Sequence, residues 1–272
     1  MNFTVEKEQE LLEFLLEKIK NKSKNTIKSL LSHEMVLVNK KVITKYNYLL
    51  KKNYTVEIIK KINDIDIIYE DNNIIVVNKP SGLLSISTEK ETEKTLYKYI
   101  SDYVKKSNKN AKIFVVHRLD KDTSGIVIFS KNQDFKNKLQ QNWNDEVIRN
   151  YYAVVEGILE KKSGTIKSYL KENSFHKTYS SNKGEFAITN YEVIKTNDLY
   201  SLLKVNIKTG KKNQIRVHLS DINHPIVGDK KYGSKIRAKR LMLCAYNVEF
   251  KNNSKYKFEI PYPEEFKKYI KA

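Results

Sequence analysis

An aspartate lies in a polar motif between two strongly apolar runs. The motif is HRLDKDTSG, residues 117–125, and it follows IFVV and precedes IVIF. A carboxylate beside a buried strand end is costly unless a cation or hydrogen bonds compensate it. The neighbours Arg118 and Lys121 need not face Asp120 in a turn, so a distant arginine is a better partner, and KTGKKNQIRVHL offers Arg216. Such a pair would keep Asp120 ionised as a nucleophile or a base, whereas the alternative is an ion pair that only fixes the loop.

The composition points to a polyanionic partner. The 272 residues hold 51 Lys and Arg against 32 Asp and Glu, which gives a net charge of +19. A field of this sign attracts nucleic acid, although a lysine-rich proteome would produce part of the same bias. In so lysine-rich a chain, each arginine marks a place where a flat group with several donors is needed rather than a point charge. The five arginines are Arg118, Arg149, Arg216, Arg237 and Arg240.

Other classes of protein are disfavoured. Cys244 is the single cysteine, so no intramolecular disulfide can form. His218 and His224 lack further ligands at metal-binding spacing, so no metal is expected. The opening residues MNFTVEKEQE show no signal pattern, and no apolar run approaches the ~20 residues of a membrane span. We therefore expect a soluble cytoplasmic protein without membrane contact.

The elements that must position Asp120 are mostly strands. Few of them alternate singly with helices, which favours a mixed, mostly antiparallel sheet with flanking helices. The expected fold class is therefore α+β rather than doubly wound. Apolar spacing predicts helices at 95–104, 134–143, 213–221 and 263–269, and strands that include 151–157, 164–170, 187–193, 199–208, 241–245 and 257–260.

The first 62 residues are expected to form a separate small domain. Residues 5–21 carry a helical stripe of Leu and Ile, and a second basic helix follows Ser23 or Asn25. VLVNKKVI, residues 36–43, then predicts a strand, a short basic turn and a strand. Residues 60–66 are expected to be a hinge. The sequence therefore divides into an αα-ββ domain, 1–62, and a larger domain, 63–272.

Several ordered motifs resemble those of the RluA-type RNA pseudouridine synthases. The resemblance spans about residues 65–270, in the order of the family, and VLVNKKVI in front of it is similar to the alpha-L RNA-binding module of ribosomal-protein type. The motifs are HRLDKDTSGIVIFSKN, IIVVNKPSGLL at 74–84, RNYYAVVEG at 149–157, KTGKKNQIRVHL at 208–219, HPIVGDKKYG at 224–233 and RLMLCA at 240–245.

The resemblance implies a specific reaction. Members of this family convert uridine in RNA to pseudouridine without a cofactor, by detaching the uracil, turning it and rejoining it through carbon five. Asp120 matches the catalytic aspartate, which acts as a nucleophile or as a base, Tyr151 matches the active-site tyrosine, and Arg216 matches the arginine that pairs with the aspartate. The expected RNA-binding residues are His117, Arg118, Arg149 and Lys79. The expected partner of this monomer is RNA, with large-subunit ribosomal RNA favoured and transfer RNA possible.

The chain also departs from the family. Lys211, Lys212 and Asn213 stand where Arg-Thr-His is usual, Arg149 replaces a lysine, and Cys244 replaces a common histidine. Because lysine loses the bidentate geometry of arginine, these changes bear on target choice more than on catalysis. A non-catalytic RNA-binding protein for ribosome assembly on the same fold stays an alternative, and so do a synthase directed to transfer RNA and a hydrolase with a carboxylate nucleophile.

Overall fold

The structure is a computed structural model that describes residues 2–19, 23–32, 35–58, 65–88, 91, 94–252 and 254–270. The chain forms two compact units, residues 1–64 and 65–272, so the division falls two residues beyond the expected one. Of the expected hinge at 60–66, residues 60–64 lie outside the described part. Each unit has a hydrophobic core of its own and is described separately.

The small unit contains two short helices and short strands. The strands form one sheet in the order β1-β6-β3-β4 and a separate pair, β2-β5. The strands that precede the helices and β5 were missed, because two or three residues are too few to show periodicity. Its elements are β1 Asn2–Thr4, β2 Gln9–Glu10, α1 Leu11–Lys18, α2 Lys24–Ser32, β3 Val36–Val38, β4 Lys41–Val42, β5 Leu49–Leu50 and β6 Thr55–Ile58.

The core of the small unit follows the apolar stripe of the sequence. Leu11, Phe14 and Leu15 on α1 are fully buried, together with Ile27 on α2 and Val56 on β6. The turn between β3 and β4 uses Asn39 and Lys40 with φ of 48° and 67°, the left-handed conformations that a two-residue hairpin needs. The predicted strand, basic turn and strand are therefore present.

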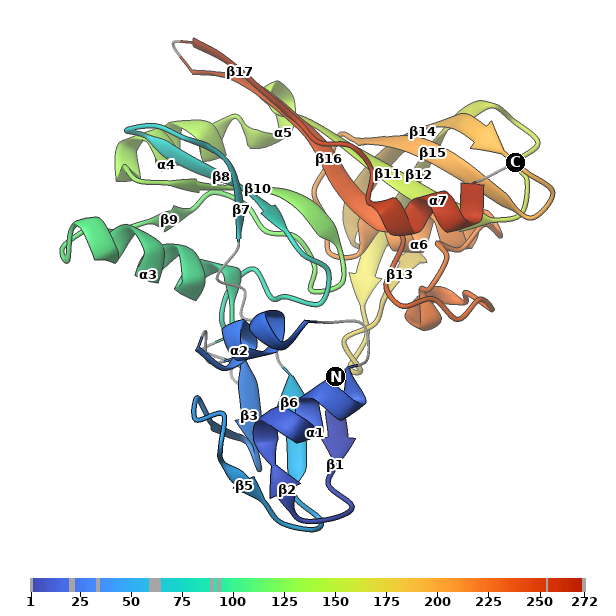
Figure 1. The fold of residues 1–272 in the computed structure, drawn as a ribbon. Coiled ribbons are helices and arrows are strands. Elements are labelled where there is room, and N and C mark those ends of the chain that lie inside the picture. The colour runs from blue at the N-terminus through green and yellow to red at the C-terminus, as the bar shows by residue number, and fades with distance from the viewer. Residues whose placement is uncertain are drawn as a thin grey trace. The chain divides into compact units, whose positions relative to one another are not determined.

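The large unit is built on one sheet with helices packed against it, which confirms the predicted α+β class (Figure 1). Its elements are β7 Asp66–Glu70, β8 Ile74–Lys79, α3 Leu96–Ser107, β9 Phe114–Val115, β10 Ser124–Ser130, α4 Gln133–Gln141, α5 Trp143–Glu146, β11 Ile148–Glu156, β12 Ser163–Glu172, β13 Thr178–Ser181, β14 Glu185–Thr196, β15 Tyr200–Ile207, α6 Gln214–Asp221, the 3₁₀ turn η1 Lys230–Tyr232, β16 Leu243–Asn252, β17 Ser254–Glu259 and α7 Glu264–Ile270.

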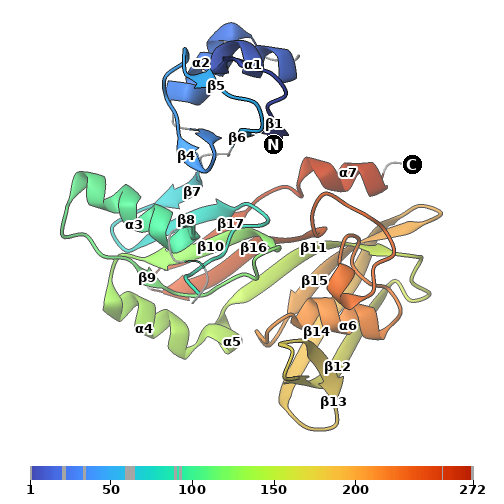
Figure 2. The ribbon, with the colours of Figure 1, turned by 90° about the horizontal axis from the view of Figure 1, so that it is seen from below.

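The sheet is mixed. Eleven strands run in the order β13-β12-β14-β15-β11-β16-β10-β8-β7, with β17 beside β16 and β9 beside β10. The pair β10–β16 is parallel, and the other strand pairs of this sheet are antiparallel. That parallel contact brings the end of the 117–125 motif beside β16, although about 120 residues separate them. Figure 2 shows α6 and α7 on opposite sides of the sheet.

Candidate functional site

The 117–125 motif forms the connection between β9 and β10. Strand β9 pairs with the far end of β10, so the chain leaves the sheet after Val115 and returns at Ser124. The loop is tied to the segment after β8, because Gly82 N–H donates to Lys121 O at 2.9 Å and Ser85 Oγ donates to Leu119 O at 2.7 Å. The loop between β9 and β10 can therefore carry charged residues, because hydrogen bonds from the segment after β8 satisfy carbonyl groups of its backbone.

Gly125 lets β10 approach β16. Its φ is +116°, and a Cβ at this position would lie 2.1 Å from the carbonyl oxygen of Ala245. Any other residue would therefore push the two parallel strands apart. The glycine that closes the motif thus holds this end of the loop against β16.

Asp120 is half-buried at the end of this loop. Burial raises its pKa, while the charges of Arg216, Lys79, Lys212 and Arg118, in descending order, oppose that rise. Four cations therefore surround a carboxyl group that is withdrawn from water. Such a group is a stronger base than an exposed aspartate.

Arg216 on α6 does not form the ion pair that the sequence predicted. Its Nε and Nη2 groups each donate to Asp229 at 2.7 Å, and Nη1 donates to Asn213 Oδ1 at 2.9 Å. The predicted Arg216–Asp120 pair is thus wrong in this structure. Asp229 satisfies the guanidinium because it presents both carboxylate oxygens to it, a geometry that favours bidentate bonding. Arg216 acts on Asp120 as a nearby positive charge.

Tyr151 enters the site from the central strand β11. The pairing of β11 with β16 shifts register between Asn150 and Tyr151, and such a bulge changes the direction of a side chain. Tyr151 is 9% exposed. Burial raises its pKa to about 12, the charge of Arg149 opposes the rise, and Asp120 adds to it. The phenol is therefore neutral at pH 7.

Asp120, Tyr151 and Arg216 line one cavity of about 710 Å³. They come from a loop, a strand and a helix that lie far apart in the sequence. The cavity falls within the size of typical small-ligand pockets, and its wall combines apolar and cationic side chains. It therefore has room for a nucleobase turned out of an RNA strand.

The chain matches the RNA pseudouridylate synthase family over residues 73–221. This range contains all three of these side chains. The chain belongs to the RNA pseudouridylate synthase family. Its activity is that of an RNA pseudouridine synthase, an isomerase, and this confirms the prediction from the motifs.

Named relatives resemble the synthase over most of its length. It is 33% identical over 226 residues to the uncharacterised RNA pseudouridine synthase YhcT of Bacillus subtilis, covering 78% of this chain and 74% of that protein. It is 32% identical to an uncharacterised RNA pseudouridine synthase of Aquifex aeolicus, covering 98% of this chain and 95% of that protein. The solved structure of human RNA pseudouridylate synthase domain containing 4 has a TM-score of 0.65 at 22% identity, covering 74% and 90%, and shows the same fold.

The expected RNA-binding residues divide into two groups. His117, Arg118 and Arg149 line the cavity of the synthase, and Arg118 is exposed. Lys79 is fully buried, and its ammonium group donates to the carbonyl oxygens of Pro80, Leu83 and Lys121 at 3.1, 2.8 and 3.0 Å. The expected contact of Lys79 with RNA stays a prediction, and this structure disfavours it because the three N–H groups are used within the protein.

His117 and Arg149 are layered on Trp143. The rings of His117 and Trp143 stack at 4.7 Å, and the guanidinium of Arg149 lies 5.7 Å from the centre of the Trp143 ring. His117 Nε2 accepts the N–H of Ile128 at 3.1 Å, and burial, with the charge of Arg149, lowers its pKa to about 3. His117 is therefore a neutral wall of the cavity.

Arg149 is a buried cation without an anionic partner. It is 4% exposed, its Nε–H lacks a hydrogen-bond partner, and it forms no ion pair within the described ranges. Its Nη2 reaches only Asn144 Oδ1 and Lys208 O, at 3.2 and 3.3 Å. A buried cation in this state favours an anionic or strongly accepting ligand in the cavity.

Sequence reasoning missed two supports of Arg216. The side chain of Asn213 accepts a hydrogen bond from Arg216 and does not cap α6. Its backbone is left-handed, with a φ of 54°. Asp229 is 1% exposed and lies in HPIVGDKKYG, a motif whose resemblance to the family gave this aspartate no role. A carboxylate in a segment directly after the arginine segment was the available signal. The unusual Asn213 thus has a structural role.

Two general features complete the description. Among the residues that the structure describes, no group of three or more His, Cys, Asp or Glu side chains has an arrangement that could hold a metal ion. In the same part of the chain, no helix is long and apolar enough to cross a membrane.

Proposed function

We propose that the synthase acts on uridines of large-subunit ribosomal RNA. Support comes from a relative of Borreliella burgdorferi named ribosomal large subunit pseudouridine synthase D, which is 37% identical over 216 residues, covering 74% of this chain and 66% of that protein. The net charge of +19 suits a large polyanion. Transfer RNA is the competing substrate.

The main observation that supports a reaction at this site is that Asp120, Tyr151 and Arg216 line the same cavity. A uridine inside an RNA stem must first be flipped out, which costs a few kcal/mol. Stacking on an aromatic ring and cationic contacts with phosphates offset that cost. Tyr151 supplies the ring, and Arg118 is the exposed cation beside Asp120.

The proposed chemistry begins at the sugar. Asp120 either attacks the carbon that holds the uracil, or removes a proton to give an unsaturated sugar. In both cases the bond between sugar and nitrogen breaks, and its electron pair leaves with the uracil. Four surrounding cations favour the ionised carboxylate that either step needs.

The later steps use Tyr151 and Arg149. After the uracil turns, its carbon five bonds to the sugar. In the first route the bond between the sugar and Asp120 breaks as this happens, and in the second the unsaturated sugar takes back its proton from Asp120. Carbon five must then lose a proton. Tyr151 can accept that proton once its phenol has passed its own proton to the carboxylate of Asp120, which lines the same cavity and is free again after the preceding step. The charge of Arg149 favours this transient phenolate because it opposes the rise in the tyrosine pKa. The neutral phenol otherwise serves as the stacking surface.

We also propose that the small unit binds RNA. Its exposed surface carries Lys24, Lys28, Lys40, Lys41, Lys45, Lys51 and Lys52. An array of lysines contributes affinity that depends on salt and not on sequence.

The test is tritium release from RNA labelled at carbon five of uridine. An unmodified transcript of bacterial large-subunit ribosomal RNA and a transfer RNA pool are compared as substrates. We expect release from the ribosomal transcript, and its loss in Asp120→Ala and Tyr151→Phe. Release from transfer RNA alone would contradict the proposed substrate, and binding without release from either would favour the non-catalytic alternative.

A further inference from the structure

The hairpin between β12 and β13 presents an aromatic side chain to solvent. Phe175 is 87% exposed, the largest value among the exposed large apolar side chains of the described residues. A single exposed apolar residue is common in proteins and by itself indicates no function. What distinguishes Phe175 is that the tip around it is held in place and surrounded by positive charge.

Hydrogen bonds within the hairpin hold the backbone around Phe175. Asn173 Oδ1 accepts the N–H groups of Phe175 and Lys177 at 3.0 and 2.9 Å, and His176 N–H donates to Asn173 O at 3.0 Å. His176 adopts a φ of 55°, which is uncommon for any residue except glycine. A tip in one conformation loses little entropy when it binds a ligand.

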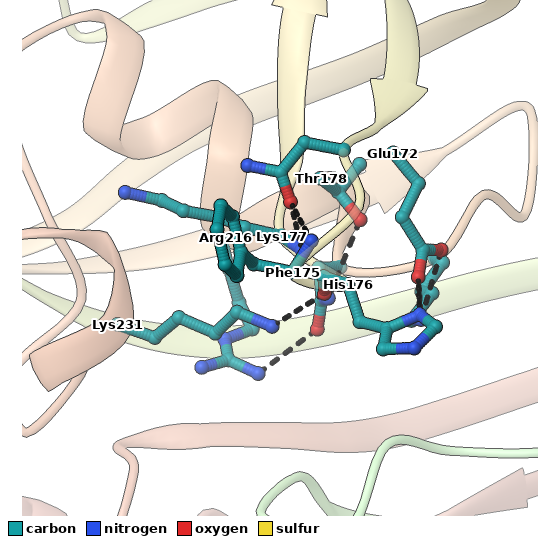
Figure 3. Close-up of polar contacts among 10 residues, drawn as sticks. Glu172, Phe175, His176, Lys177, Thr178, Arg216 and Lys231 are labelled. Carbon is teal, nitrogen blue, oxygen red and sulfur yellow. Dashed lines mark hydrogen bonds and ion pairs between the residues drawn. The ribbon is translucent and has the colours of Figure 1, made fainter.

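Two contacts join this tip to the catalytic part of the synthase. Lys231 on η1 donates to His176 O at 2.8 Å, and Glu172 contacts His176 at 2.7 Å (Figure 3). Glu172 also contacts Lys212 at 2.8 Å. Lys212 also lines the cavity that holds Asp120. The hairpin is thus continuous with the rim of that cavity.

Positive charge gathers beneath the tip around one ring. Lys177, Lys231 and Arg216 lie 5.8, 6.0 and 4.9 Å from the centre of the Tyr232 ring. Burial lowers the pKa of Lys231, the charges of Arg216 and Lys212 lower it further, and those of Glu172 and Asp120 oppose the shift. Arg216 and Lys212 are paired with Asp229 and Glu172. A phosphate beside Lys177 and Lys231 would offset the repulsion that Lys231 experiences.

We propose that residues 173–177, with Lys212 and Lys231, form a second RNA-contacting surface that grips the strand next to the flipped uridine. Lys177 and Lys231 bind its phosphates, and Phe175 stacks on an unpaired base. The inference rests on the proposed function, because it takes the RNA strand to leave the cavity across Lys212. Stacking on aromatic residues tolerates any base, so the surface adds affinity rather than sequence choice.

Binding is measured by fluorescence anisotropy with a labelled, mixed-sequence single-stranded RNA of about 20 nucleotides. The full chain carries Asp120→Asn so that the RNA is not converted during titration. We expect Phe175→Ala to weaken binding by about 5- to 150-fold, the range that corresponds to one lost base stack. Because Phe175 is so exposed, its removal leaves the fold intact.

Charge removal is tested through the salt dependence of the same binding. Lys177→Gln with Lys231→Gln keeps N–H donors, including one for His176 O, but loses two positive charges. We expect the slope of log affinity against log salt to fall by about 1.4, that is about 0.7 for each lost phosphate contact on a single strand. Lys251→Gln with Lys255→Gln, at the exposed tip of the β16–β17 hairpin, is the matched control and should leave the slope unchanged.

A third variant reports stacking directly. Phe175→Trp places a second tryptophan in a chain whose sole tryptophan is Trp143. We expect RNA to quench the added fluorescence beyond any change seen for Trp143 alone. Equal affinity, an equal salt slope and no added quenching would overturn the inference.

The outcome separates this inference from the proposed function. Tritium release from the ribosomal transcript with unchanged binding by the hairpin variants refutes the hairpin inference alone. No release from any RNA by the intact chain refutes the proposed function, whatever the hairpin variants do. If both proposals hold, the hairpin variants raise KM for the transcript while kcat at saturation stays within about twofold.

Discussion

Asp229 and Asp120 both lie near Arg216, but their environments differ. Asp229 is 1% exposed, and both of its carboxylate oxygens accept from Arg216 at 2.7 Å. Asp120 lines the cavity without an ion pair to Arg216, and burial raises its pKa. The difference shows that one guanidinium has two roles. Bidentate hydrogen bonding to Asp229 fixes the position of Arg216, and the positive charge of Arg216 then acts on Asp120.

The largest expected effect separates the two carboxylates by activity. Asp120→Asn should lower tritium release by about 10²- to 10⁴-fold, the range for loss of an acid–base group. The free energy of unfolding of this variant at pH 7 should be equal to or higher than that of the wild type. A carboxyl with a raised folded pKa loses stability as pH rises from its unfolded to its folded pKa, and the amide removes that loss.

Chemical denaturation and the release assay measure this pair of outcomes. A large loss of stability in Asp120→Asn would mean that Asp120 is a structural ion-pair residue, the alternative that its sequence left open.

Asp229→Asn should show the reverse balance. The change leaves a buried guanidinium without a counter-charge, which costs about 3–5 kcal/mol of unfolding free energy. Activity should fall because Arg216 loses its position. Denaturant titration measures the loss, and Asp198→Asn, at an exposed carboxylate, is the control with an expected change within about 0.5 kcal/mol. A change that small in Asp229→Asn would contradict the positioning role.

A third buried charge gives a smaller effect that depends on pH. Burial lowers the pKa of Lys79 to about 7, although the charges of Asp122 and Asp120 oppose the shift. Between about pH 7 and 10, the unfolded chain therefore binds one more proton at this lysine than the folded chain. Stability from this group rises with pH in that window, by about 1.4 kcal/mol per pH unit.

Lys79→Met should remove this contribution. The difference in unfolding free energy between wild type and variant is measured at pH 7, 8 and 9 by urea denaturation. Equal pH slopes for the two proteins would show that Lys79 keeps its ordinary pKa when folded.

The smallest expected effect concerns the acidic limb of the pH profile of kcat. Lys212 favours the ionised form of Asp120, so Lys212→Ala should move that limb to higher pH. The shift should be small, because Lys212 is exposed and solvent screens its charge. Saturating RNA separates this effect from weaker binding. Lys211→Ala, which removes a partner of Glu185, is the control, and an equal shift in both would refute a specific effect of Lys212.

The sequence alone determined the longer elements and the family. Apolar spacing predicted a helix at 213–221, which the structure has at Gln214–Asp221, and a strand at 199–208, which it has at Tyr200–Ile207. Such patterns are local, so they survive without tertiary information. Ordered motifs around Asp120, Tyr151 and Arg216 likewise predicted the reaction, because reactive side chains require fixed residue types.

Only the tertiary structure decided which groups are partners. Asp229 rather than Asp120 binds Arg216, Lys79 turns inward to three carbonyl oxygens, and Arg149 stays buried without a counter-charge. None of these follows from a periodic pattern, because each depends on distances between segments that the chain brings together only after the sheet has formed. Burial then changes the free energy of each charged group according to its neighbours in space. These neighbours come from segments that lie far apart in the sequence.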